Sequence, residues 1–307
     1  MIEVLGLTKR YGTTVAVDDL SFVVPDGKVT GFLGPNGAGK STTMRMMVGL
    51  DEPTAGHVRI DGRPYGTRRF PLHQVGALLE AKSTHPGRTA RNHLSWLAAS
   101  NAIPMTRVDE VLELVGLTSV AGRRLGGFSL GMGQRLGIAS ALLGDPRVLL
   151  LDEPVNGLDP EGILWVRHFL RSLAAEGRAI LISSHLMSEM ALTADQVVVI
   201  GRGRLIAEGS VADVIRGSSL NRVRVVTPDA TRFGVLLESK GATVTAEDTE
   251  TLAVGGMDCR DVGLLAASAG VTLFELTPEA ASLEDAFMEM TRGAGEFATD
   301  DDLVHGA

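Results

Sequence analysis

The stretch that decides the fold is rich in glycine and reads Gly34-Pro35-Asn36-Gly37-Ala38-Gly39-Lys40-Ser41-Thr42. It fits the pattern G-x-x-x-x-G-K-[ST] at every position. A short apolar run at 29–33 precedes it and a helical pattern at 40–48 follows it, which places the loop between a strand and a helix. Glycines let backbone N–H groups turn inward around a phosphate, and the helix adds the positive end of its dipole. The stretch therefore predicts a nucleotide site contacted by all nine residues, with Lys40 on the β- and γ-phosphates and the Ser41 hydroxyl on Mg²⁺.

A second motif lies further along the chain, where four apolar residues are followed by two acids in Val148-Leu149-Leu150-Leu151-Asp152-Glu153. The apolar run predicts a buried strand, and the carboxyl ends of strands in open α/β sheets are where ligands bind. An acidic pair after a strand is by itself more often a solvated turn. Beside a phosphate loop, however, Asp152 is suited to hold Mg²⁺ directly or through water, and Glu153 to accept a proton from an attacking water.

Short apolar runs alternate with helical patterns over most of the chain. They predict a mostly parallel α/β sheet that is buried on both faces, with a helical region at about 85–144. The predicted strands are 2–5, 20–24, 29–33, 74–79, 148–151, 179–183 and 196–200, and the predicted helices are 40–48, 90–101, 108–115, 131–143 and 161–175.

The composition changes near residues 216–219, and a second unit follows. Its predicted order is strand 223–226, helix 231–240, strands 243–246 and 251–254, helix 260–269 and strand 271–276. This βαββαβ order predicts a small ferredoxin-like α+β module. A helix at 283–291 carries Leu283, Ala286, Phe287 and Met290 at the spacing of one packed face, which either closes its own domain or contacts a dimer partner. The expected domains are 1–215 and 220–293, followed by an acidic, disordered tail at 294–307.

Composition and charge exclude several classes of protein. The net charge of −8 argues against binding to nucleic acid, and a single cysteine rules out a disulfide framework or a cysteine-based zinc site. No apolar stretch reaches the roughly 18 residues that cross a bilayer. The first residues also lack the basic and apolar regions of a secretory signal. We therefore expect a cytoplasmic protein that reaches a membrane only through a partner.

Further motifs resemble those of one family, the ATP-binding subunits of ABC transporters. Residues 128–132, Phe-Ser-Leu-Gly-Met, followed by Gln134 and Arg135, resemble the family signature, commonly L-S-G-G-Q, with leucine at 130 where glycine is usual. Residues 156–159, Asn-Gly-Leu-Asp, resemble its D-loop. A serine that starts a helix, with glycine beside it, can bind a γ-phosphate. The resemblance implies that Ser129, Gly131 and Asp159 contribute to nucleotide binding.

Three more positions take their meaning from this resemblance. His185, after the strand at 179–183, matches the switch histidine on the γ-phosphate and the catalytic water, although a lone histidine there is more often passive. Tyr11 matches the aromatic residue that stacks on adenine. Position 80 is glutamate where the family's Q-loop has glutamine, as in a subset that includes bacitracin and lantibiotic exporters. An ionised glutamate only accepts hydrogen bonds, and Glu80 is expected to hold Mg²⁺ or the attacking water.

The resemblance covers residues 1 to about 215 and implies an ABC-type P-loop ATPase. It also implies a head-to-tail dimer, either a homodimer or a heterodimer with a related chain, that encloses two ATP molecules. Transport then needs a separately encoded membrane permease, which would dock on the region at about 85–144 and the loop at Glu80. Trp96 in this region is either a permease contact or part of a local core. The second unit resembles the extension of daunorubicin-type drug exporters, which favours export of a drug, an antibiotic or another hydrophobic compound.

Other functions within the same superfamily stay open as alternatives. The chain could serve an importer, or it could be a soluble ABC-type ATPase that acts on DNA or ribosomes. Against the second stand the missing coiled-coil insertion, the missing zinc cysteines and the presence of one phosphate loop. A nucleotide-binding regulator without turnover is a third alternative, and the presence of both Glu153 and His185 weakens it.

Overall fold

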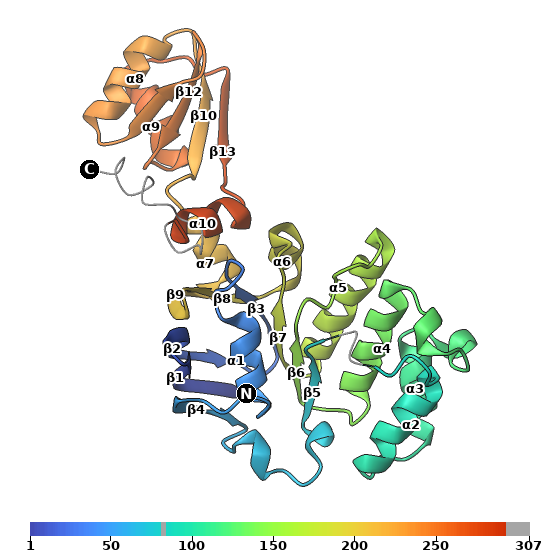
Figure 1. The fold of residues 1–307 in the computed structure, drawn as a ribbon. Helices are drawn as coiled ribbons and strands as arrows, with labels where there is room; N and C mark the ends of the chain where they lie inside the picture. The colour runs from blue at the N-terminus through green and yellow to red at the C-terminus, as the bar shows by residue number, and fades with distance from the viewer. Residues whose placement is uncertain (81–83, 293–307) are drawn as a thin grey trace. The chain divides into compact units, whose positions relative to one another are not determined.

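The computed structural model describes residues 1–80 and 84–292, so the predicted tail at 294–307 lies outside the described residues (Figure 1). The chain forms two compact units, Met1–Gly209 and Ser210–Met290. In the described part of the chain, no helix combines the length and the apolar character needed to cross a membrane.

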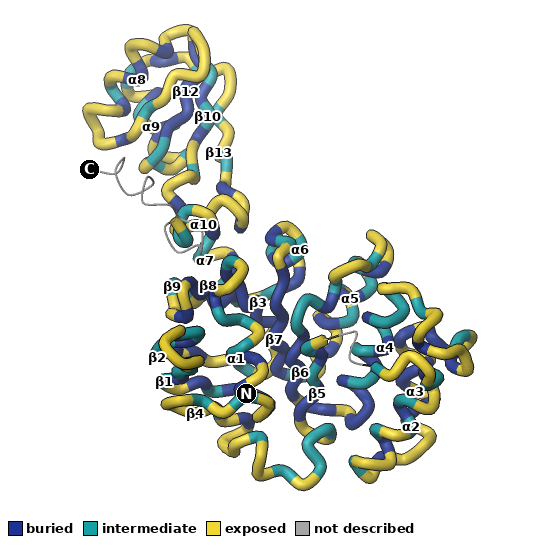
Figure 2. Tube along the Cα trace, in the orientation of Figure 1, coloured by how far each residue is buried: buried dark blue, intermediate teal, exposed yellow. Residues whose placement is uncertain are grey.

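The first unit is built on a six-stranded sheet with the order β5-β6-β7-β3-β8-β9. The neighbours from β5 to β8 run parallel, and every residue of β3, β6 and β7 is buried (Figure 2). The prediction of a mostly parallel, doubly buried sheet is therefore confirmed. The strands are β3 (Val29–Leu33), β5 (Val75–Leu78), β6 (Val148–Leu151), β7 (Ala179–Ser183), β8 (Gln196–Gly201) and β9 (Arg204–Ser210).

A smaller antiparallel sheet has the order β2-β1-β4. Strands β1 (Ile2–Tyr11) and β2 (Thr14–Val24) are longer than the predicted 2–5 and 20–24. Strand β4 (Ala55–Ile60) was not predicted; among its residues only Ile60 is buried, and polar and apolar residues alternate only over 57–60. Gly56 in β4 has a φ of +73°, and a Cβ there would lie 2.1 Å from the carbonyl oxygen of Gly6, so this close approach requires glycine.

The helices of the first unit fall into two groups. Helix α1 (Lys40–Met47), α5 (Pro160–Ala175) and the unpredicted α6 (Met187–Thr193) belong to the sheet region. Helices α2 (Ala90–Ser100), α3 (Thr106–Leu114) and α4 (Leu130–Leu142) contact one another and form the predicted helical region, where α4 also packs on β5 (Figure 1).

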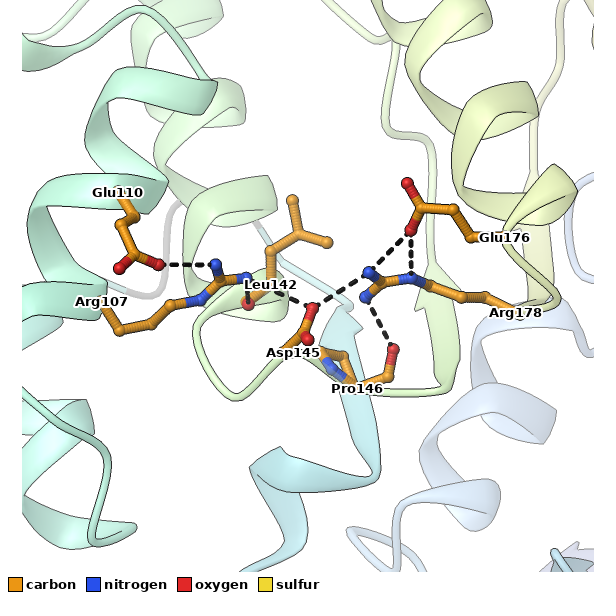
Figure 3. Close-up of polar contacts among 7 residues, drawn as sticks. All are labelled: Arg107, Glu110, Leu142, Asp145, Pro146, Glu176 and Arg178. Carbon is orange, nitrogen blue, oxygen red and sulfur yellow. Dashed lines mark hydrogen bonds and ion pairs between the residues drawn. The ribbon is translucent and has the colours of Figure 1, made fainter.

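An ion-pair network joins this helical region to the sheet region (Figure 3). Asp145 lies in the loop between α4 and β6. Its Oδ1 atom pairs with Arg107 Nη2 of α3 at 3.4 Å and with Arg178 Nη2, just before β7, at 3.0 Å. Both arginines also donate to backbone carbonyls, Arg107 to Leu142 and Arg178 to Pro146, at 3.2 and 3.0 Å. One carboxylate therefore connects two parts of the unit that are far apart in sequence.

Replacing Asp145 with asparagine should lower the free energy of unfolding by about 0.5–1 kcal/mol. Asparagine keeps the shape and tolerates the φ of +52° at this position, but it removes the charge shared by the two arginines. Urea denaturation measures the effect. The control is Glu113→Gln on α3, which removes an exposed carboxylate that forms no ion pair in the described structure. Equal losses in both variants would show that the network contributes nothing.

The second unit is a four-stranded antiparallel sheet with the order β11-β12-β10-β13, which is the strand order of a ferredoxin-like fold. The predicted α+β module is confirmed, with a core that includes Val225, Phe233, Leu252, Val254 and Val262. Its elements are α7 (Val211–Arg216), β10 (Arg222–Val226), α8 (Ala230–Ser239), β11 (Thr243–Ala246), β12 (Thr251–Gly255), α9 (Cys259–Ala269), β13 (Glu275–Glu279) and α10 (Leu283–Met290).

The structure moves one predicted strand of this unit and favours one of the two roles left open for its last helix. The last strand, predicted at 271–276, is wrong in position, because the Val271 N–H bonds the carbonyl of Ala266 at the end of α9 and pairing begins only at Glu275. Pro278 is tolerated there because β13 is an edge strand. Helix α10 buries Leu283, Ala286 and Phe287 and packs on α7 within the same unit. Its apolar face therefore closes its own domain.

Candidate nucleotide-binding site

A cavity of about 330 Å³ lies at the loop between β3 and α1. It is bounded on one side by the predicted phosphate loop and on the other by the two acids that follow β6. Gly34 and Pro35 belong to the loop but do not line the cavity. The lining residues are Ala16, Asn36, Gly37, Ala38, Gly39, Lys40, Ser41, Thr42, Asp152 and Glu153.

The loop owes its shape to two glycines in the left-handed region. Gly37 has a φ of +79° and Gly39 a φ of +100°. A Cβ on Gly39 would lie 2.5 Å from the carbonyl oxygen of Ala16, so the position excludes any other residue. Gly39 is also the N-cap of α1, and no side chain caps this helix. The first N–H groups of α1 are thus left to an anion in the cavity.

Lys40 is half-buried at the start of α1. Its Nζ donates to the carbonyl oxygens of Gly34 at 2.5 Å and Pro35 at 3.1 Å. Burial lowers the pKa of Lys40, and the carboxylates of Glu153 and Asp152 oppose that shift. A phosphate in the cavity would add negative charge and raise the pKa again, which favours the charged ammonium when the site is filled.

The structure brings two of the three predicted Mg²⁺ ligands together. Ser41 Oγ donates to Asp152 Oδ2 at 2.7 Å, and Ser183 Oγ at the end of β7 donates to the other carboxylate oxygen. Glu80 lies exposed just beyond β5. Within residues 1–80 and 84–292, no three His, Cys, Asp or Glu side chains converge into a metal site. A hydroxyl and one carboxylate fit Mg²⁺, which keeps waters and takes phosphate oxygens as its other ligands.

Glu153 and His185 lie side by side at this edge of the sheet. His185 Nδ1 is 2.8 Å from Glu153 Oε2, and the Glu153 N–H donates to Ser183 Oγ at 2.9 Å. Glu153 has a φ of +51°, an uncommon conformation for a residue with a side chain. Its carboxylate lies at the cavity wall and can accept a proton, with an imidazole as hydrogen-bond partner.

The residues assigned through the signature and the D-loop lie elsewhere. Ser129 caps α4 by accepting the Met132 N–H at 3.2 Å, and Asp159 caps α5 by accepting the Gly162 N–H at 2.9 Å. Neither these two nor Gly131 lines the phosphate cavity. Ser129 instead lines a second cavity of about 420 Å³. The other residues around it are Thr84, Pro86, Leu125, Phe128, Leu130 and Gly133.

Tyr11 ends β1 with an exposed ring and does not line the phosphate cavity either. Its hydroxyl donates to Asp51 Oδ2 at 3.2 Å, and Lys9 Nζ lies 4.9 Å from its ring centroid. Sequence reasoning missed Ser183, Ala16 and Gln134, whose contacts with the site come from other strands and helices. Ser183 had a local signal, its place at the end of a strand next to β6, and Gln134 had its place in the signature-like motif.

A glycine-rich loop between a parallel strand and a helix, with a serine–aspartate pair and an acid at the next strand end, defines an α/β protein that binds nucleoside triphosphates. Residues 17–156 match the family model described as "ABC transporter", and residues 221–284 match a domain of unknown function. The chain is similar to a solved structure of the ATP-binding subunit of an ABC transporter, with a TM-score of 0.65 and 29% identity over 72% of this chain and 96% of that one.

Similarity to curated proteins extends over both units. The chain is 37% identical over 301 residues to YhcH of Bacillus subtilis (strain 168), an uncharacterized ABC transporter ATP-binding protein, which covers 95% of this chain and 96% of that protein. It is 44% identical to the bacitracin transport ATP-binding protein BcrA of Bacillus licheniformis (68% and 69% covered). It is 34% identical to the Nod factor export ATP-binding protein I of Rhizobium sp. (strain N33) (94% and 96% covered). The chain belongs to the ABC transporter ATP-binding proteins, and it is an ATPase.

Proposed function

We propose that this ATPase drives export of a peptide antibiotic or another hydrophobic compound through a separately encoded membrane permease. The similarity to BcrA, a bacitracin transport protein, and to a Nod factor export protein supports this direction and this kind of cargo. The C-terminal α+β module supports it too, because the relative named for export matches the chain over 94% of its length. In this proposal the protein lies at the cytoplasmic face of the membrane, held there by the permease.

One observation supports a dimer as the active form of the protein. In one chain the phosphate cavity and the Ser129 cavity are separate and share no lining residue. A γ-phosphate held by Lys40 needs further donors opposite the loop. The start of α4, with Ser129 and Gly131, offers them from a second chain. We therefore infer a head-to-tail dimer, either of two copies or with a related chain, in which Ser129, Gly131 and Asp159 complete the partner's site.

Within the site, most residues act by position and charge. The loop residues 36–39 and the start of α1 hold the phosphates through backbone N–H groups, and Lys40 neutralises charge on the β- and γ-phosphates. Tyr11 offers its ring to adenine. Ser41 and Asp152 would hold Mg²⁺, which when bound neutralises charge on the phosphate oxygens. Glu80, which accepts hydrogen bonds only, orients the attacking water or takes part in that metal site.

Glu153 takes the proton of the attacking water, and His185 holds the Glu153 carboxylate in place. The Nδ1–Oε2 distance of 2.8 Å supports this pairing, since a histidine in hydrogen-bond contact restricts the carboxylate to one orientation. The His185 side chain is exposed and does not line the phosphate cavity, and in this proposal it also contacts the γ-phosphate once the nucleotide is bound. His185 would then sense whether the phosphate is present.

The permease contact is proposed on the helical region. Leu94 on α2 is buried, whereas Trp96 is 57% exposed, with the Arg88 guanidinium 5.1 Å from its ring centroid. A large exposed aromatic residue beside a cation is a common anchor in protein interfaces. Of the two roles open from the sequence, the exposure of Trp96 supports the partner contact.

The test is purification of tagged Glu153→Gln protein from its native cell in mild detergent with ATP and Mg²⁺. A polytopic membrane protein should co-purify, and adding Trp96→Ala should reduce its yield several-fold, because the anchor side chain is lost. Wild-type protein without nucleotide is the control. Recovery of ribosomal or DNA-bound proteins in place of a permease would overturn the transport proposal while leaving the ATP site intact.

Direction and cargo need a second measurement once the permease is known. Cells that express the permease with the wild-type ATPase should tolerate more bacitracin than cells with the permease and Glu153→Gln. A wild-type pair that instead promotes uptake of a solute, with no gain in tolerance to antibiotics, would identify an importer.

A further inference from the structure

One face of α4 contacts the short segment that carries Glu153. The Gln134 side chain is 4% exposed, and its Nε2 donates to the backbone oxygen of Glu153 at 2.5 Å. The same oxygen accepts the Asn156 N–H at 3.1 Å, which closes a tight turn. Because Glu153 is in the left-handed region, its conformation has to be held by its surroundings. A buried amide on its carbonyl does this.

A second contact lies one helical turn earlier. Leu130 and Gln134 are four residues apart, so they share one face of α4. A Cβ on Gly157 would lie 2.0 Å from Leu130 Cδ2, and Gly157 has a φ of +74°. The leucine therefore occupies the space that a side chain at 157 would need. Gln134 contacts residue 153 and Leu130 lies against residue 157, and these two positions are also four residues apart.

We infer that Gln134 is a positioning residue for Glu153, and that Gln134 and Leu130 together make the start of α4 and residues 153–157 move as one body. This rests on the proposed dimer, in which Ser129 at the same helix end meets the partner's nucleotide. When the partner's nucleotide binds Ser129 and displaces the start of α4, the Glu153 of the same chain as that Ser129 moves with it. That Glu153 belongs to the other nucleotide site of the dimer. Because Leu130 fills the space beside residue 157, leucine at 130 requires glycine at 157.

Gln134→Met tests the first half. Methionine keeps the length and volume of the side chain and loses the amide donor. The expected result for the full chain is a fall in kcat of about ten-fold, with unchanged affinity for fluorescent MgATP and a lower Hill coefficient for ATP. The matched control, Gln74→Met at an exposed position, should behave as wild type. Unchanged kcat per folded molecule, or a loss confined to thermal stability, would overturn the inference.

A double-mutant cycle tests the second half. Gly157→Ala should reduce kcat at least ten-fold beside Leu130, and several-fold less in the Leu130→Gly background, where space for the Cβ exists. Strain from the positive φ at 157 is the same in both backgrounds and cancels. Strictly additive effects would overturn the contact. If wild type hydrolyses ATP and binds a permease yet the cycle is additive, the inference alone fails; if wild type binds no permease, the proposed function alone fails.

Discussion

Glu153→Gln protein should bind ATP as wild type does and hydrolyse it at least about a hundred-fold more slowly, since a general base contributes on the order of 10²–10⁴ to a rate. The amide has the shape of the carboxylate and can keep the contact with His185, now 2.8 Å away, but it cannot take a proton. Single-turnover release of phosphate measures the chemical step, and a fluorescent ATP analogue measures binding.

The control is Glu161→Gln, which neutralises an exposed acid in the first turn of α5. It should leave both binding and turnover at the wild-type level. Turnover by Glu153→Gln at the wild-type rate would remove Glu153 from the role of base. Loss of ATP binding would mean instead that the carboxylate shapes the phosphate cavity, which Glu153 also lines.

The parts of the fold that could be predicted are those whose signal is local in sequence. Residues 148–151 are four consecutive apolar residues between turns, and β6 begins and ends there. Strand β4 has one buried residue and owes its place to pairing with β1, so its own six residues, which alternate only over 57–60, are a weak signal. The shift of β13 has the same origin, because Val271 bonds the end of α9 and the strand pairs with β10 only from Glu275 onward.

The candidate site likewise has parts that could be predicted from local sequence and parts that could not. The loop at 34–42 and the acids after β6 could be found because each motif is continuous and the topology of a parallel sheet joins them. Ser183 ends a predicted strand and Gln134 lies in the signature-like motif, but neither position reveals the contact with the acids, which joins distant segments of the chain. Ser129 starts a predicted helix, and the structure shows that both it and Asp159 are helix N-caps. Their expected meaning for the nucleotide came only from the family resemblance.

Lys40→Met should lose about ten- to a hundred-fold in ATP affinity, the range for a hydrogen bond to a charged group, and its ATPase activity should fall to background. Methionine fills the space of the lysine stem but has no charge for the β- and γ-phosphates. Isothermal titration measures the affinity, and Lys28→Met, an exposed lysine outside the cavity, is the matched control.

Without nucleotide, the same variant loses the two hydrogen bonds from Lys40 Nζ but also avoids the cost of a buried charge, so its stability should lie close to that of wild type. Burial lowers the pKa of Lys40 in the folded chain, so the folded state binds fewer protons than the unfolded state and the charged ammonium opposes folding below that lowered pKa. This unfavourable contribution fades as the pH rises toward the unfolded value, and methionine removes it altogether. Thermal unfolding of wild type should shift upward with MgATP, while Lys40→Met should show little shift, because a ligand stabilises only the state that binds it. A variant that is less stable without nucleotide yet keeps the full shift would show that Lys40 serves the fold of the loop and not the phosphates.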